Sequence, residues 1–122
     1  MATQQNYLVT EAHRLVYQRL VEIARKNGPP IGYGEIFDIM GLERGNHAAN
    51  QAGRLLDDIN QHAHLLGKPM LSALVVNQQT HMPGGGFYGL AVRFGKLPAN
   101  STDQQKAEFW KRELARVYTA DW

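Results

Sequence analysis

The amino-acid sequence predicts an α+β domain with a winged-helix-like helix-turn-helix, a short β-hairpin and a closing C-terminal helix. Apolar residues recur at three- and four-residue spacing in the first half of the chain and again near its end, which is typical of amphipathic helices. Between these stretches lie a short, partly β-branched apolar run and a glycine-rich loop, which favour strands joined by a turn. No long linker or repeat interrupts the 122 residues, so residues 1–122 are expected to form a single domain.

Three helices are expected in the first half of the chain. The first spans residues 10–27, where Thr10 is a suitable N-cap and a Gly-Pro-Pro turn ends the helix. The second spans about 34–40 and ends at Gly41, and the third spans about 47–66. Small and apolar side chains follow one face of the third helix, which predicts that this face is buried. They are Ala48, Ala52, Leu55, Leu56, Ile59 and Ala63.

The second half mixes strand and turn signals. Residues 70–76 (Met-Leu-Ser-Ala-Leu-Val-Val) are the best strand candidate, because this run is short, apolar and partly β-branched. The glycines and proline of 77–86 predict an exposed loop. Residues 87–92 either return as a second strand, which would complete the hairpin, or begin a helix. A last helix is expected after a cap at Ser101 or Thr102.

Composition limits the classes of function. The 43% of hydrophobic and 20% of charged residues are those of a globular domain rather than a disordered chain. The absence of cysteine excludes a disulfide framework, a thiolate nucleophile and a cysteine-based metal site. A polar N-terminal stretch and the lack of a long apolar run predict a cytoplasmic protein without a membrane partner. The net charge of +2 neither indicates nor excludes nucleic acid, because the thirteen basic residues are dispersed among eleven acidic ones.

Four short segments carry a resemblance to a known family. They are residues 31–36 (Ile-Gly-Tyr-Gly-Glu-Ile), 47–54 (His-Ala-Ala-Asn-Gln-Ala-Gly-Arg), 68–71 (Lys-Pro-Met-Leu) and 86–92 (Gly-Phe-Tyr-Gly-Leu-Ala-Val). In this order they resemble the DNA alkyltransferase domain family, which comprises the O6-alkylguanine alkyltransferases and the non-enzymatic alkyltransferase-like proteins. The matching motifs are the Tyr-Gly-x-Ile start of its helix-turn-helix, its recognition helix, its Pro-Ile-Leu approach to the active-site strand and its Gly-Gly-Leu-Ala stretch. The resemblance covers about residues 16–92 and implies the family's fold and a DNA-facing helix.

The chain departs from that family at its reactive centre. The family's Pro-Cys-His-Arg motif should lie just before Val75-Val76, where this chain has only Ser72-Ala73-Leu74, two residues short. Without a thiolate, direct alkyl transfer is excluded. The arginine with which the family fills the gap left by a flipped base aligns with Asn50, and this disfavours base flipping, which costs a few kcal/mol. The sequence therefore predicts a DNA-binding protein that is not an enzyme and needs no cofactor.

The DNA-binding residues are expected around the third helix and the glycine loop. Asparagine and glutamine can pair with adenine, arginine with guanine, and the N–H groups at a helix N-terminus can hold a phosphate. In the resembling family, the tyrosine that matches Tyr33 helps to rotate a nucleotide through its phosphate, and the loop is expected to act as a wing near the DNA backbone. The candidate residues are Tyr33, Arg44, Asn46, His47, Asn50, Gln51, Arg54, His81, Arg93 and Lys96.

Ordinary structural roles compete with this hypothesis. The third helix can simply present a polar face, and Asp57 and Asp58 would repel phosphates if they share its exposed side. Tyr33 can pack at the start of the second helix with its hydroxyl in solvent. The glycine loop lacks the Lys-Ser/Thr of a P-loop, and no histidine pair has the i, i+4 spacing that often holds a metal. Neither a nucleotide cradle nor a metal site is therefore expected.

Two other classes of function stay open. The same fold could serve as a protein-interaction module, in which a partner chain or a second copy meets Tyr88, Trp110 and Trp122. Trp122 could equally dock back on the domain. A small hydrolase would use Ser72 as nucleophile and His81 as base, although the chain has no nucleophile-elbow signature. Among these classes the sequence favours DNA binding.

Overall fold

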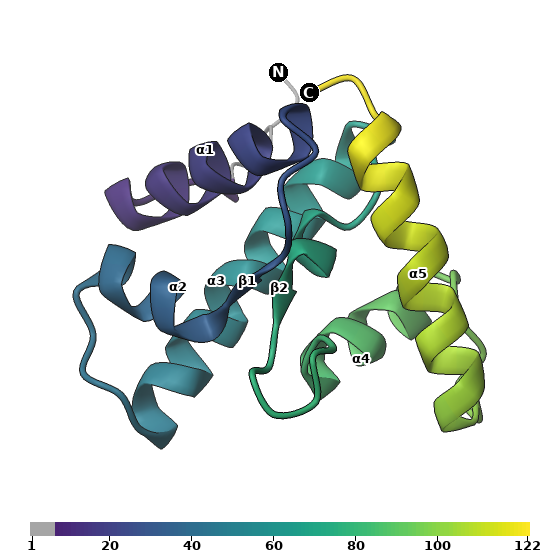
Figure 1. The fold of residues 1–122 in the computed structure, drawn as a ribbon. Coiled ribbons are helices and arrows are strands. Elements are labelled where there is room, and N and C mark those ends of the chain that lie inside the picture. The colour runs from purple at the N-terminus through teal and green to yellow at the C-terminus, as the bar shows by residue number, and fades with distance from the viewer. Residues whose placement is uncertain (1–6) are drawn as a thin grey trace, which may run out of the picture.

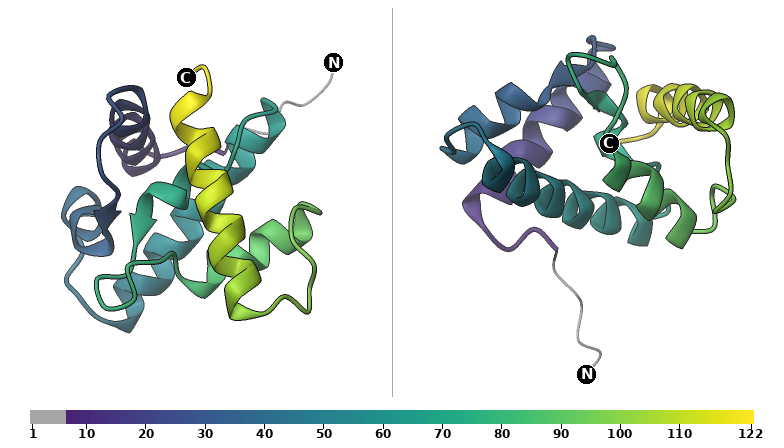
Figure 2. Two further views of the ribbon diagram at one scale, coloured as in Figure 1. Left: turned by 45° about the vertical axis from the view of Figure 1, so that its right-hand side comes forward. Right: turned by 90° about the horizontal axis from the view of Figure 1, so that it is seen from below.

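The computed structural model describes residues 7–122, and most of them are helical (Figure 1). The elements in chain order are α1 (Glu11–Arg25), β1 (Ile31–Gly32), α2 (Tyr33–Met40), α3 (Asn46–Leu65), the 3-10 helix η1 (Leu71–Leu74), β2 (Val75–Val76), α4 (Gly85–Arg93) and α5 (Asp103–Thr119). The central η1 contacts α1, α3 and α5. Figure 2 shows α5 on one side of this centre and the α1–α2 pair on the other. No helix in the described range is long and apolar enough to cross a membrane.

Helices α1, α3 and α5 confirm the periodicity of the sequence. The hydroxyl of Thr10 caps α1 by accepting the backbone N–H of His13 at 3.2 Å. Thr102 and Gln105 form a reciprocal capping box at the start of α5, each side chain accepting the backbone N–H of the other residue. In α3 the whole predicted apolar face is buried.

Helices α2 and α3 lie in contact and are joined by the turn of residues 41–45. Gly41 ends α2 with a φ of +70°, a left-handed conformation that glycine adopts without strain. Ile36 anchors α2, since its side chain is fully buried in the core. The turn and the first residues of α3 consequently remain at the surface.

The predicted β-hairpin is wrong. Strands β1 and β2 pair in parallel, and the register sets Ile31 opposite Val75 and Gly32 opposite Val76. Residues 87–92, one of whose two expected states was a second strand, belong to α4 instead. The glycines that favoured a turn lie at the start of α4, and Phe87, Leu90 and Ala91 are buried at helical spacing. The domain is thus mostly helical with a two-stranded parallel sheet, which is compatible with the broad α+β class but does not confirm a winged helix.

Only the last two residues of the predicted strand 70–76 form a strand. The preceding Leu71–Leu74 form η1, because side chains from other helices accept the backbone N–H groups of this segment. Met70 N–H donates to the carboxylate of Glu113 at 2.9 Å, and Ser72 N–H donates to Asn60 Oδ1 at 3.0 Å. These bonds satisfy donors that a strand would have paired with a neighbouring strand.

Candidate nucleic-acid interface

The N-terminal half of α3 carries five of the ten predicted DNA-binding residues and presents four of them to solvent. Those that are exposed are Asn46, His47, Asn50 and Arg54, while Gln51 is half-buried. The N-cap residue Gly45 provides no side-chain acceptor, so the first N–H groups of α3 have no side-chain cap. Side-chain amides, a guanidinium and uncapped helix N–H groups therefore share one surface.

Arg44 lies in the turn before α3, and its guanidinium packs on the first turn of α2. A Cβ placed on Gly34 would come within 2.6 Å of Arg44 Nη2, so glycine leaves the room that this arginine occupies. The N-terminus of α2 also lacks a side-chain cap. Because Arg44 is exposed, a cation and a helix N-terminus lie together where an anion can approach them.

The two acidic residues of α3 point in different directions. Asp58 pairs with His13 of α1, with Asp58 Oδ2 2.9 Å from His13 Nε2. Asp57 instead lines a cavity together with Asn50 and Arg54, which precede it by two turns and one turn of the helix. Only one of the two acids therefore shares the side of α3 that carries the candidate DNA contacts.

The cavity has a volume of about 760 Å³ and opens between α2, α3 and the start of α4. Parallel pairing explains its position, because Tyr33 follows β1, Asn77 follows β2, and the carboxyl ends of parallel strands meet at one edge of a sheet. Both residues line the cavity. Its aromatic walls are the rings of Tyr33, Phe37 and Phe87. Its polar lining includes Asn50, Arg54, Asp57, Ser72 and Asn77.

Tyr33 is fixed to the start of α4 and does not simply extend into solvent. Its hydroxyl oxygen accepts a hydrogen bond from Gly84 N–H at 3.3 Å. A Cβ on Gly84 would lie 3.1 Å from that oxygen, so a larger residue would displace the hydroxyl by a few tenths of an ångström. Burial raises the pKa of Tyr33 above its ordinary value. The ring therefore forms a rigid wall of the cavity.

Asp57 accepts no hydrogen bond from any residue in the range 7–122. Its Oδ2 lies 4.0 Å from Arg93 Nη2, and its Oδ1 lies 4.0 Å from the position that a Cβ on Gly86 would take. Burial raises the pKa of Asp57, the positive charge of Arg93 lowers it, and the negative charge of Asp58 raises it further. The carboxylate thus retains unused acceptor capacity at the cavity.

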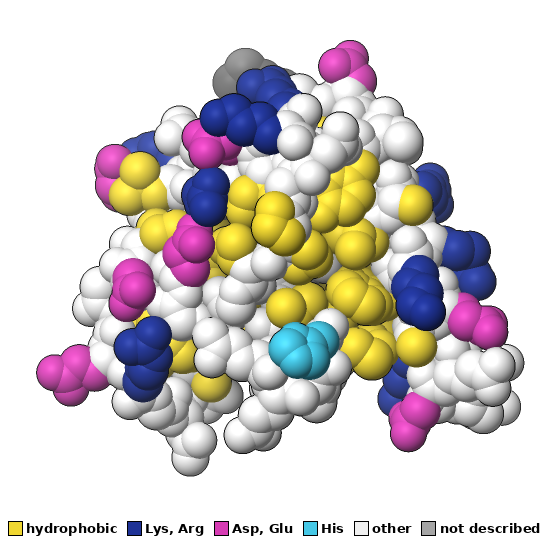
Figure 3. All heavy atoms as spheres, viewed as in Figure 1, with side chains coloured by type: hydrophobic (Ala, Val, Ile, Leu, Met, Phe, Trp, Pro, Cys, Tyr) yellow, Lys and Arg dark blue, Asp and Glu magenta, His cyan; other side chains and the backbone are white. Residues whose placement is uncertain are grey.

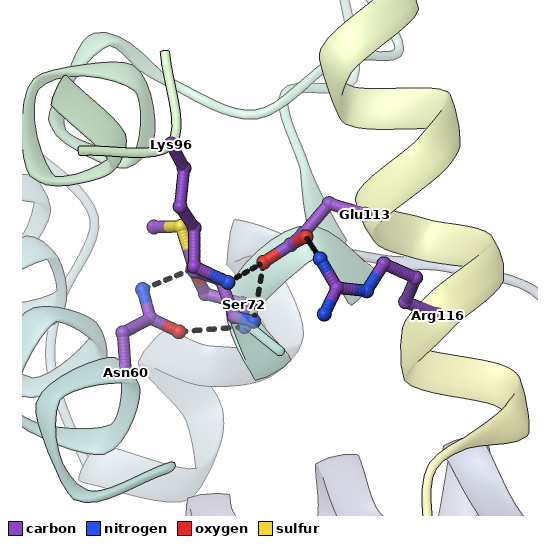
Figure 4. Close-up of polar contacts among 6 residues, drawn as sticks. Asn60, Ser72, Lys96, Glu113 and Arg116 are labelled. Atoms are coloured by element: carbon purple, nitrogen blue, oxygen red, sulfur yellow. Dashed lines mark hydrogen bonds and ion pairs between the residues drawn. The ribbon is translucent and has the colours of Figure 1, made fainter. Parts of the chain in front are cut away.

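The structure does not place Ser72 and His81, the two residues required by the hydrolase hypothesis, in hydrogen-bond contact. Ser72 lines the cavity, but its hydroxyl accepts a hydrogen bond from Asn60 Nδ2 at 2.7 Å (Figure 4). His81 is exposed in the loop after β2, and no hydrogen bond connects it with Ser72 in the described part of the chain. The same part contains no cluster of three side chains that could hold a metal ion.

The remaining basic candidates differ in accessibility. Arg93 is exposed and lies close to Asp57. Lys96 is largely buried and forms an ion pair with Glu113, with Nζ 2.7 Å from Oε2 (Figure 4). A DNA contact by Lys96 would have to break that ion pair, so Arg93 is the better placed of the two.

The aromatic residues considered for an interaction module pack on the domain itself. Trp110 Nε1 donates to the Ala73 carbonyl at 2.9 Å, and Trp122 Nε1 donates to the Val117 carbonyl at 2.7 Å. Tyr88 is buried. Trp122 thus docks back on the protein, where Lys68 approaches its ring. Figure 3 shows hydrophobic side chains gathered between α5 and the α1–α2 half of this face, with charged side chains around them.

Sequence reasoning placed the exposed side of α3 but missed the cavity, because segments distant in the chain line it. One signal was available, since Asn50, Arg54 and Asp57 are spaced by four and three residues and therefore share a helix face. Comparisons with protein-family models, characterised proteins and solved structures found no match for this chain. The resemblance to alkyltransferase domains therefore stays a prediction.

Proposed function

We propose that the protein binds DNA, without catalysing a reaction on it, through Arg44, the N-terminal half of α3 and the adjoining cavity. The observation that carries this proposal is the gathering of the exposed amides of Asn46 and Asn50 and the guanidinium of Arg54 on α3, directly beside a cavity with aromatic walls. Arginine and uncapped helix N–H groups suit phosphate oxygens, and asparagine suits base edges. Because the net charge is only +2, binding is expected to be weak at physiological salt.

The cavity supports a role in holding one base outside the double helix. Its volume of about 760 Å³ lies in the range of small-molecule sites, and aromatic rings are surfaces on which a base can stack. Extrusion costs a few kcal/mol and costs least for a base that is already unpaired or mismatched. Asn50 is shorter than the arginine with which the resembling family fills the gap left by a flipped base. An unpaired base, which leaves no such gap to fill, is therefore the ligand that this site can take most readily.

Equilibrium binding to duplex, single-stranded and mismatched DNA at two salt concentrations tests the proposal. Affinity is expected to fall as salt rises, because cationic contacts release counterions from the phosphates. Mismatched duplexes are expected to bind more tightly than paired ones. No binding to any of these DNAs at low salt would refute the proposal and leave the interaction module as the favoured alternative.

Substitution of two arginines locates the interface. Arg44→Ala is expected to weaken binding to every sequence and to reduce the salt slope by about one unit, as the loss of one phosphate contact does. Arg54→Ala should act in the same way or, if Arg54 contacts a base, cost roughly 1–3 kcal/mol and relax the preference at one position. Arg112→Ala on α5 is the control, because it removes an equal charge from an exposed position outside the cavity. Equal weakening by Arg44→Ala and Arg112→Ala would contradict the assigned interface.

A further inference from the structure

Phosphate binding does not explain Asp57, because a carboxylate repels phosphate oxygens. The side chain is 31% exposed and lines the cavity one helical turn beyond Arg54. No group in residues 7–122 donates a hydrogen bond to it, and Arg93 at 4.0 Å is beyond hydrogen-bond distance. A partly desolvated acceptor without a donor is unfavourable, and a ligand that supplies N–H groups would remove this cost.

We propose that Asp57 makes the cavity selective for a nucleobase edge with two adjacent N–H donors, and that guanine is the base selected. This inference rests on the proposed DNA binding. The two oxygens of a carboxylate accept a pair of parallel hydrogen bonds. Guanine presents N1–H and its N2 amino group side by side. Adenine and cytosine present an amino group beside an acceptor nitrogen, and thymine presents one N–H between two carbonyls.

The rest of the lining agrees with a purine of this kind. The rings of Tyr33, Phe37 and Phe87 offer apolar surface for stacking. Gly85 and Gly86 line the cavity at the N-terminus of α4, which has no side-chain cap, and their N–H groups suit an acceptor such as guanine O6. Alkylation of O6 turns N1 into an acceptor, which would oppose the carboxylate. The cavity should therefore discriminate against O6-alkylguanine.

Three duplexes that differ in one base test the role of Asp57. The base is guanine, hypoxanthine, which lacks the N2 amino group, or O6-methylguanine, which lacks N1–H, and each stands opposite an abasic site so that no pair must be broken. Affinity for the wild-type protein, measured by fluorescence anisotropy, is expected to fall in that order, by about tenfold between guanine and O6-methylguanine. Asp57→Asn should abolish the order. Asp58→Asn removes the same charge outside the cavity and should preserve it.

Each outcome bears on the proposal. An unchanged order in Asp57→Asn, or tighter binding of O6-methylguanine than guanine by the wild type, would overturn it, provided that thermal melting shows both variants folded. If no duplex binds at low salt, the proposed DNA binding fails, and guanosine and inosine monophosphates then decide about Asp57 alone. Larger shifts of the Tyr33 and Phe87 ring resonances with guanosine monophosphate than with inosine monophosphate, a difference lost in Asp57→Asn, would uphold the selectivity. Absence of such a difference would overturn it.

Discussion

Gly34 controls the position of Arg44, because the guanidinium occupies the space in which a side chain at residue 34 would lie. Gly34→Ala is expected to leave the melting temperature unchanged or to raise it, since alanine in a helix is favoured over glycine by roughly 0.5–1 kcal/mol. The new methyl group should nevertheless displace the flexible arginine and weaken DNA binding. Melting and binding are measured on Gly34→Ala, Arg44→Ala and the double variant. Additive losses of affinity would show that the two residues act independently.

Tyr88 buries its hydroxyl without a hydrogen-bond partner in residues 7–122. An unsatisfied buried hydroxyl is unfavourable, so Tyr88→Phe is expected to be neutral or to raise the free energy of unfolding by about 1 kcal/mol. Denaturant unfolding at neutral pH measures this change. A loss of more than about 1 kcal/mol would mean that the hydroxyl has a partner, such as a bound water molecule.

Tyr88 also makes the free energy of unfolding depend on pH in the alkaline range. Burial raises the pKa of Tyr88 from 10.0 to about 12 in the folded protein. Its stabilising contribution is fully present below pH 10 and is lost as the pH rises to 12, because the unfolded chain releases the proton first. A rise of this size corresponds to about 3 kcal/mol. Tyr88→Phe should therefore lose less stability than the parent across this interval, while the other tyrosines affect both proteins equally.

Within α3, one helix combines a buried face with the candidate interface. Leu56 is 4% exposed and also borders the cavity. Leu56→Ala is expected to cost roughly 2–5 kcal/mol of unfolding free energy, as truncations of buried leucine do. Arg54→Ala, two residues away on the exposed side, should change stability by less than about 0.5 kcal/mol. Similar melting of Leu56→Ala and the parent would show that the buried face is wrongly assigned.

The helices whose caps and apolar spacing lie within their own segment could be predicted from the sequence. Elements that depend on contacts with residues far along the chain could not. The apolar spacing and the caps at Thr10 and Thr102 are local, and α1, α3 and α5 follow them. The 3-10 helix η1 depends on acceptors from Asn60 and Glu113, which no short sequence window contains. Helix α4 starts in glycines that resemble a turn, and only the spacing of its buried residues signalled a helix.

At the scale of the molecule, the parallel sheet brings residues from distant parts of the chain together at the cavity. The exposed residues of α3 follow from helical periodicity, but the cavity also requires Tyr33 and Asn77, 44 positions apart. Pairing of Gly32 with Val76 brings these two residues to one edge, and the Tyr33–Gly84 hydrogen bond then fixes the start of α4. The sequence analysis expected β2 to form a hairpin with the following segment. It therefore could not predict the parallel pairing of β1 with β2 or the cavity that this pairing creates.

Glu113 ties distant parts of the fold together (Figure 4). The side chain is 2% exposed, accepts the Met70 N–H, and pairs with Lys96 at 2.7 Å and with Arg116 at 3.6 Å. Through these contacts, α5 holds both the segment before η1 and the segment after α4. A buried carboxylate with one backbone donor and two cations is well compensated, whereas removal of its charge leaves Lys96, which is only 18% exposed, without a partner.

Glu113→Gln is therefore expected to lower the free energy of unfolding by about 3 kcal/mol, because the amide keeps the shape and the acceptor for Met70 but not the charge. Lys96→Met in the same protein should recover part of that loss, since the stranded ammonium is then removed. Urea unfolding of the parent, both single variants and the double variant provides the comparison. If Glu113→Gln and the double variant unfold at the same urea concentration, the loss does not arise from the unpaired Lys96 ammonium, and the other charge-dependent contact of Glu113, its ion pair with Arg116, must account for it.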